Sequence, residues 1–169
     1  MKATLALSAA FVIGFLLHPE GWGLHPADPY TSEILTHQFA HNSWEHLGAN
    51  LVTFLAFGTW FERRAGALAT VVLFLLAGAL GGLTEALADP GYTGAIVGAS
   101  GGVSAFLGVF ARLERWAPLI VIPVLGAYSW EALDMAGSNA DWSHLAGFAV
   151  GLVWALFIQP VQSKEVSHA

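Results

Sequence analysis

Hydrophobic residues occur in six long runs, separated by short polar or turn-forming stretches. The runs cover about residues 3–18, 43–61, 65–88, 100–113, 116–135 and 142–158. Most approach the roughly 20 residues that an α-helix needs to cross a bilayer. The pattern therefore predicts an all-α membrane protein with six transmembrane helices. The fourth run is short and follows a glycine-rich segment, so we expect its helix to start within the membrane.

The start of the chain allows a second interpretation. The first run, Ala3–Leu17, follows Lys2 and contains small residues, a pattern that also resembles a cleaved signal peptide. The next stretch, His18–Tyr30, is rich in proline and glycine, which predicts an irregular loop.

The composition agrees with a membrane protein. Hydrophobic residues make up 56% of the 169 residues and charged residues only 11%, against about 25% charged in a soluble domain. The mean hydropathy is +0.62. These values argue against a soluble enzyme and a disordered tail, and the net charge of −6 argues against nucleic-acid binding. The absence of cysteine excludes disulfides and cysteine zinc sites. We expect one membrane domain over residues 1–169 and no soluble domain.

The basic residues predict the orientation. If six helices alternate in direction, all of them fall on one side of the membrane: Lys2, Arg63, Arg64, Arg112, Arg115 and Lys164. The positive-inside rule makes that side the cytoplasm. We therefore expect a multi-pass protein of the plasma membrane with both chain ends cytoplasmic.

Four polar residues are predicted to lie at membrane depth, namely His46, Asn50, Ser100 and His144. Such groups are costly in hydrocarbon and are usually functional. At about 1.5 Å rise per residue, Asn50, Ser100 and His144 lie in one layer, roughly 10 Å below the outer surface. This common depth suggests a single site that opens to the outer side. A serine at a helix N-terminus also lies beside unpaired N–H groups that can hold an oxyanion.

These residues form motifs that resemble the rhomboid intramembrane serine proteases. The second run carries His41-Asn-Ser-Trp-Glu-His46-Leu-Gly-Ala-Asn50, similar to the family's histidine–histidine–asparagine pattern. The fourth opens with Gly98-Ala99-Ser100-Gly101, which matches the family's G-x-S-G. The sixth carries His144-Leu-Ala-Gly147-Phe-Ala-Val-Gly151, similar to its H-x-x-G-x-x-x-G. Ser104 departs from the family, in which this position is often a tyrosine that packs on the catalytic histidine.

The resemblance implies a minimal six-helix member with a Ser100–His144 catalytic dyad. Ser100 would attack a peptide carbonyl, while His144 accepts and then returns the proton. Gly147 and Gly151 allow close helix approach, and Gly98 and Gly101 flank the nucleophile. On the residues alone, Ser100 could instead be a small packing residue and His144 an interfacial histidine.

The resemblance also implies an oxyanion hole. Its donors would be His46, Asn50 and the backbone N–H groups of Ser100 and Ala99. His46 and Asn50 are four residues apart, so they share a helix face. The alternative is that both residues only make interhelical hydrogen bonds.

Two further pairs of residues leave alternatives open. His37 and His41 have a spacing that permits a metal site, but no third ligand is evident, so we expect no metal and no cofactor. We expect these histidines instead to keep the mouth of the site hydrated. Glu131 and Asp134 either solvate the outer end of the fifth helix or line an entrance for substrate.

The expected function is cleavage of transmembrane protein substrates near the outer face of the bilayer. Two rival functions remain: a catalytically inactive rhomboid-like protein that binds membrane helices, and a small transporter.

Overall fold

A computed structural model describes residues 1–17, 20–124, 126 and 141–158, and within these ranges the chain forms helices joined by loops. The long helices are α1 (Lys2–Leu17), α3 (Trp44–Ala65), α4 (Ala67–Ala88), α5 (Ser100–Leu113) and α7 (Asp141–Trp154). Residues 118–124 are also helical, and most of the fifth predicted span lies outside the described residues.

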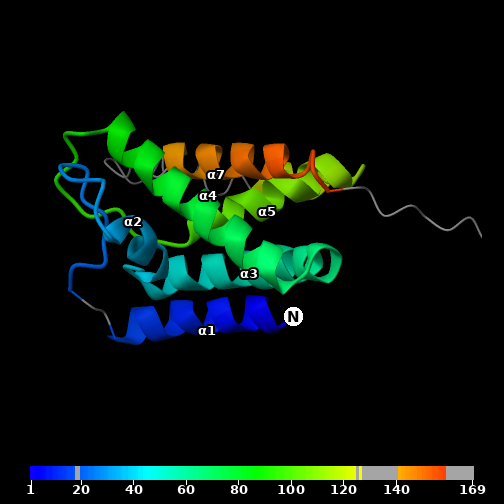
Figure 1. Ribbon diagram of the computed structural model, residues 1–169, viewed down its shortest axis with the longest axis horizontal. Helices are drawn as coiled ribbons and strands as arrows, with labels where there is room; N and C mark the ends of the chain where they lie inside the picture. The colour runs from blue at the N-terminus through cyan, green and yellow to red at the C-terminus, as the bar shows by residue number, and fades with distance from the viewer. Residues whose placement is uncertain (18–19, 125, 127–140, 159–169) are drawn as a thin grey trace, which may run out of the picture.

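The packing order places α4 at the centre of the bundle. It contacts α1 and α3 on one side and α5 and α7 on the other, and it crosses the bundle diagonally in Figure 1. Phenylalanines fill the core between α1, α3, α4 and α5. The rings of Phe11 and Phe74 lie 5.3 Å apart between centroids, and those of Phe54 and Phe106 lie 5.4 Å apart.

Two helices end about one turn away from their predicted ends, and the other described bounds agree to within two residues. Helix α3 continues one turn beyond Phe61, through Glu62, Arg63 and Arg64, because these are good helix formers and the arginines complement the negative end of the helix dipole. It ends at Gly66, whose φ of 86° suits glycine. Helix α7 ends at Trp154, four residues before the predicted end at Ile158.

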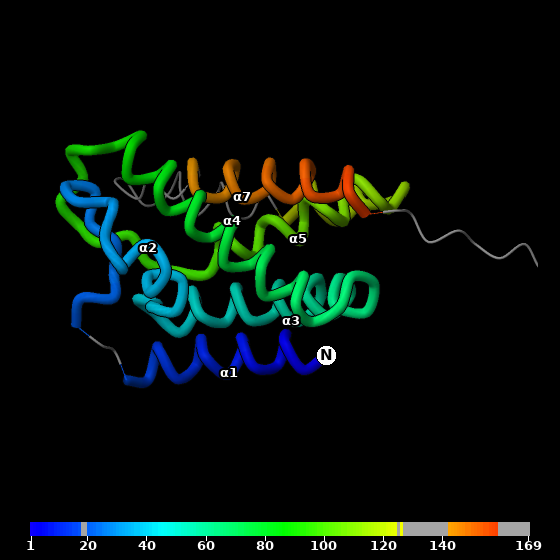
Figure 2. The backbone as a smooth tube through the Cα atoms, in the orientation of Figure 1, coloured from blue at the N-terminus to red at the C-terminus, as the bar shows by residue number. Residues whose placement is uncertain are grey.

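The long first loop contains structure that the sequence did not predict. It carries the short helix α2 (Glu33–Thr36) and a 3₁₀ turn over His37–Phe39. It is tied to the segment before α5 by an isolated bridge, in which Leu24 and Ile96 exchange backbone hydrogen bonds of 3.0 and 2.8 Å. The two loops therefore gather at one end of the bundle (Figure 2).

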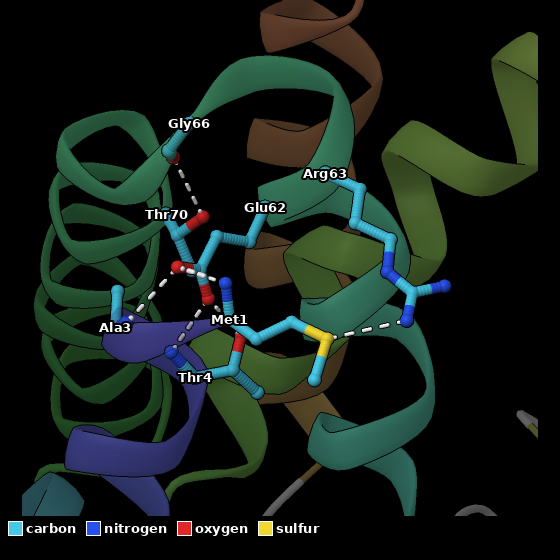
Figure 3. A network of polar contacts seen from close by, with 7 residues as sticks. All are labelled: Met1, Ala3, Thr4, Glu62, Arg63, Gly66 and Thr70. Carbon is cyan, nitrogen blue, oxygen red and sulfur yellow. Dashed lines mark hydrogen bonds and ion pairs between the residues drawn. The ribbon is translucent and has the colours of Figure 1, made fainter.

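The other end of the bundle joins the start of α1 to the ends of α3 and α5. Glu62 accepts hydrogen bonds from the backbone of Ala3 and Thr4, and the Arg63 guanidinium lies 3.2 Å from the Met1 sulfur (Figure 3). Arg64 forms a 2.8 Å ion pair with Glu114, just after α5. The basic residues that were predicted to lie on the cytoplasmic side belong to the helix ends found here: Lys2, Arg63, Arg64, Arg112 and Arg115.

By length and composition, one of the described helices, α4, could cross a membrane unaided. Three shorter helices are also apolar: α1, α5 and most of α7. Leucines and valines of α4 point outward, among them Leu68, Val72, Leu76 and Leu80. An apolar exterior of this kind suits contact with lipid.

Candidate active site

Ser100 is the first residue of α5, as the sequence predicted, and its side chain is buried. The residue before it, Ala99, already has helical backbone angles. Gly98 has a φ of 121°, a conformation that side chains disfavour. The chain thus turns sharply at Gly98 and directs the serine and the first free N–H groups of α5 into the bundle.

Contacts from the first loop and α3 fix this turn. The Gly98 N–H donates a 2.9 Å hydrogen bond to the carbonyl of His37. The His46 ring packs on the other side, so close that a Cβ atom at Gly98 would lie 2.5 Å from Nε2. His46 is therefore held against Gly98, which precedes Ser100 by two residues. The family resemblance expects an oxyanion donor in this region.

His46 lies in the first turn of α3. Its backbone N–H donates to the Ser43 side chain at 3.1 Å, and its Nδ1 lies 2.9 Å from Oδ1 of Asn42. The bond to Asn42 determines which nitrogen of a neutral ring carries the proton. An Nε2–H that points toward Gly98 requires Asn42 to present its amide N–H, rather than its oxygen, to Nδ1. Sequence analysis did not single out Asn42.

Asn50 lies one turn further along α3 and is fully buried. Its side-chain nitrogen donates a 3.0 Å hydrogen bond to the carbonyl of His46. An amide nitrogen has two donors, so a second N–H remains for another acceptor. This bond lies within α3, so it is not the interhelical bond of the alternative interpretation, and the second N–H can serve a ligand.

Helix α7 packs against α5 through glycines. The backbone of Gly147 lies against the carbonyl of Gly101, and that of Gly151 against the carbonyl of Ala105. One turn before Gly147, the Ser143 hydroxyl lies 2.7 Å from the position that a Cβ of Gly101 would take. The first turns of α5 and α7 therefore meet, and they carry Ser100 and His144 respectively.

His46 also lies beside His41, which precedes α3 in the chain. The His41 and His46 rings touch edge to face, with centroids 5.0 Å apart. This contact links the first loop to the start of α3, beside the turn at Gly98.

Ser104, the departure from the family pattern, lies one turn after Ser100 and is fully buried. Its hydroxyl has no hydrogen-bond partner among the described residues. The structure thus places a small polar side chain where the resemblance expects an aromatic ring.

Among the described residues, no group of three His, Cys, Asp or Glu side chains is placed to hold a metal ion, and His37 and His41 have other contacts. Nδ1 of His37 bonds the carbonyl of Glu33 at 2.8 Å, and Nε2 packs against Gly82. His41 lines a cavity of about 230 Å³ at the loop end of the bundle, together with Glu20, Trp22 and His25. Burial and the nearby His46 ring lower the pKa of His41 to about 4.

A second residue that sequence analysis missed is Glu85, near the end of α4. Its side chain is buried, and Oε2 accepts a 2.9 Å hydrogen bond from the backbone N–H of Ser143. The signal was present in the sequence, because a carboxylate inside an otherwise apolar run is costly and needs a partner. The partner itself depended on the fold. The candidate entrance residues Glu131 and Asp134 lie outside the described residues.

The sequence of the chain matches one protein family over most of its length. The family model described as Rhomboid domain matches residues 29–160. The chain belongs to the rhomboid family. That match covers α3, α4, α5 and α7, which carry His46, Asn50, Ser100 and His144, and it also includes Ala99 just before α5. Rhomboids are multi-pass membrane proteins, which agrees with the apolar exterior of the bundle.

Similar proteins include one from a bacterium and two that are named for organelles. The chain is 28% identical to "Rhomboid protease GlpG" of Haemophilus influenzae, over 98% of this chain and 95% of that protein. It is 28% identical to "Rhomboid protein 1, mitochondrial" of Saccharomyces cerevisiae and 26% identical to "Rhomboid-like protein 11, chloroplastic" of Arabidopsis thaliana. It covers 96% and 81% of its own length in these two matches, but spans only about half the length of each relative.

Proposed function

We propose that this rhomboid is an intramembrane serine endopeptidase. The observation that carries the proposal is the contact between the first turns of α5 and α7, through Gly101, Ser143 and Gly147. This contact brings the helix ends that carry Ser100 and His144 together. A serine needs an adjacent base to act as a nucleophile, and His144 is the histidine on the facing helix.

In the proposed reaction, Ser100 Oγ attacks the carbonyl carbon of the scissile peptide bond and its proton passes to His144. The negative charge that forms on the carbonyl oxygen is met by the N–H groups at the start of α5 and by His46 and Asn50. The C–N bond then breaks, His144 returns its proton to the leaving amine, and Ser100 is left as an acyl ester. Water hydrolyses this ester with His144 again as the base.

The proposed orientation places six spans across the plasma membrane, with both chain ends cytoplasmic. It is supported by Arg63, which lies beside Met1 at the start of α1, and by its chain neighbour Arg64, at the end opposite the Leu24–Ile96 bridge. The site near that bridge then opens to the outer side. It would reach peptide bonds near the outer end of a transmembrane substrate helix, where helix-breaking residues would ease unwinding.

The test is incubation in detergent with a transmembrane substrate, comparing wild type with Ser100→Ala. Wild type should cleave it and Ser100→Ala should not. Ser104→Ala is the matched control, because it removes a buried hydroxyl from the same helix one turn away. Equal cleavage by wild type and Ser100→Ala would refute the proposal.

A fluorophosphonate probe separates the rival functions. Labelling of wild type at Ser100, and its loss in His144→Ala, would support an active protease. An inactive rhomboid-like protein that binds membrane helices, or a small transporter, would leave Ser100 unlabelled.

A further inference from the structure

Two buried glutamates of this bundle each bond the first turn of a helix other than their own. Glu62 of α3 accepts from the backbone N–H groups of Ala3 and Thr4 in α1, at 3.1 and 2.8 Å (Figure 3). Glu85 of α4 accepts from the N–H of Ser143 in α7, at 2.9 Å. Both carboxylates are more than nine-tenths buried.

These carboxylates act as helix caps, because they accept hydrogen bonds from N–H groups in the first turn of a helix. The first four N–H groups of a helix have no partner inside it, and a side chain just before the helix usually accepts from the second or third of them. Ser143 is the third residue of α7. Glu85 supplies this acceptor from a neighbouring helix, so its bond also fixes where α7 begins relative to α4.

The position of the Glu85 bond distinguishes it from the Glu62 bond. The hydroxyl of Ser143 lies within 3 Å of the positions that Cβ atoms would take on Gly81 of α4 and Gly101 of α5. Ser143 is therefore wedged at a junction of three helices. Its chain neighbour is His144, and Gly101 is the chain neighbour of Ser100. The helix start that Glu62 holds, by contrast, carries no candidate site residue.

We propose that Glu85 is a positioning residue, whose bond to the Ser143 N–H holds the first turn of α7, and with it His144, in register with Ser100. The inference rests on the proposed function. Misplacing a reacting group by about 1 Å can cost about 10²-fold in rate. A carboxylate that anchors the residue next to the base therefore affects the chemistry and not only the stability.

The experiment compares Glu85→Ala, Glu85→Gln and Glu62→Ala with wild type in detergent. The second-order rate of fluorophosphonate labelling at Ser100 reports the alignment of the dyad without any transmembrane substrate. Amide hydrogen exchange in the first turn of α7 reports the hydrogen bond between the Ser143 N–H and Glu85. Thermal denaturation reports folding. Glu62→Ala is the matched control, because it removes a buried carboxylate that bonds a different helix start.

We expect Glu85→Ala to slow labelling about 10²-fold and to speed exchange at Ser143. Steady-state cleavage of a transmembrane substrate, measured alongside, should show a lower kcat with little change in KM. Glu85→Gln should recover most of the rate, since its amide oxygen accepts the same bond. Glu62→Ala should lower the melting temperature and leave the labelling rate of the folded protein unchanged.

Labelling of folded Glu85→Ala at the wild-type rate would overturn the inference, as would a Glu85→Gln protein as slow as Glu85→Ala. If Glu85→Ala does not fold, Glu85→Asp replaces it: its shorter carboxylate falls short of Ser143, so labelling slower than in Glu85→Gln supports the inference and equal labelling overturns it. Failure of wild type itself to label Ser100 would instead refute the proposed function, and this inference with it.

Discussion

The backbone of Gly147 in α7 lies directly against the carbonyl oxygen of Gly101 in α5. No side chain separates the two helices at this point, so their axes approach as closely as backbone atoms permit. Because Gly101 follows Ser100 and Gly147 lies one turn after His144, this contact sets the separation between the proposed nucleophile and its base. The two glycines are thus part of the site although neither carries a functional group.

Gly147→Ala should therefore damage both stability and activity. The added methyl group would meet the Gly101 carbonyl, and overpacking of this kind costs about 1–3 kcal/mol. Cleavage should fall by about 10²-fold as the dyad separates. Thermal denaturation and cleavage of a transmembrane substrate measure the two effects. Gly48→Ala is the control, since it lies within helix α3 with open space around it and should be neutral or stabilising by up to about 1 kcal/mol. Equal activity of the two variants would contradict this account.

Gly98→Ala should inactivate the protein by disturbing the turn before Ser100. It adds a side chain where φ is 121° and where the His46 ring lies 2.5 Å from the new Cβ. Gly66→Ala separates backbone strain from this clash, because Gly66 also has a positive φ but has nothing within 4 Å. Fluorophosphonate labelling should be lost in Gly98→Ala and kept in folded Gly66→Ala. Similar labelling of the two would show that the His46 contact does not matter.

His46→Ala and Asn50→Ala should each reduce kcat by about 10²–10³-fold, the usual loss for one oxyanion donor. Steady-state kinetics on a transmembrane substrate measure this, with KM expected to change little because the charge develops only in the transition state. If Asn50 serves only its 3.0 Å bond to the His46 carbonyl, then Asn50→Ala would lower the melting temperature while kcat stays at the wild-type value. That result would remove Asn50 from the oxyanion hole.

Thr4→Val should destabilise the bundle without slowing the reaction. The Thr4 hydroxyl donates a 2.7 Å buried hydrogen bond to Glu62 (Figure 3), and a lost bond to a buried carboxylate costs about 1–3 kcal/mol. The matched control is Thr84→Val, whose hydroxyl bonds only its own helix at Leu80 in an exposed position. Thermal denaturation should separate the two variants. Equal melting temperatures would show that the Thr4–Glu62 bond contributes nothing to stability.

Acid should destabilise the protein through His41. Its pKa is lowered from 6.5 to about 4 in the folded state, so between these values the unfolded chain binds a proton that the folded chain does not. Stability therefore falls as the pH drops from 6.5 toward 4, and the full contribution is present above 6.5. His41→Phe removes the titrating group and keeps a ring next to Phe11, which lies 5.8 Å away. Melting temperatures across this range should fall less steeply in the variant, and an unchanged slope would contradict the assignment.

Much of this protein could be predicted from its sequence, because burial in lipid imposes rules that act locally. A run of apolar residues of the right length predicts a helix wherever it occurs, and α5 begins and ends at the predicted residues, Ser100 and Leu113. The spacing of His46 and Asn50 places them on one face of α3 whatever surrounds that helix. The motifs around Ser100 and His144 also predicted the rhomboid family, which the match over residues 29–160 confirms.

Only the tertiary structure decided which distant groups meet. The sequence showed that Glu62 and Glu85 were carboxylates near apolar runs, but not that each bonds the first turn of another helix, 58 or 59 residues away along the chain. Nor did it show that the His37 carbonyl holds Gly98, or that α2 forms within the first loop. Hydrophobicity and helix period depend on neighbours along the chain, whereas the partner of a buried polar group depends on how the helices pack.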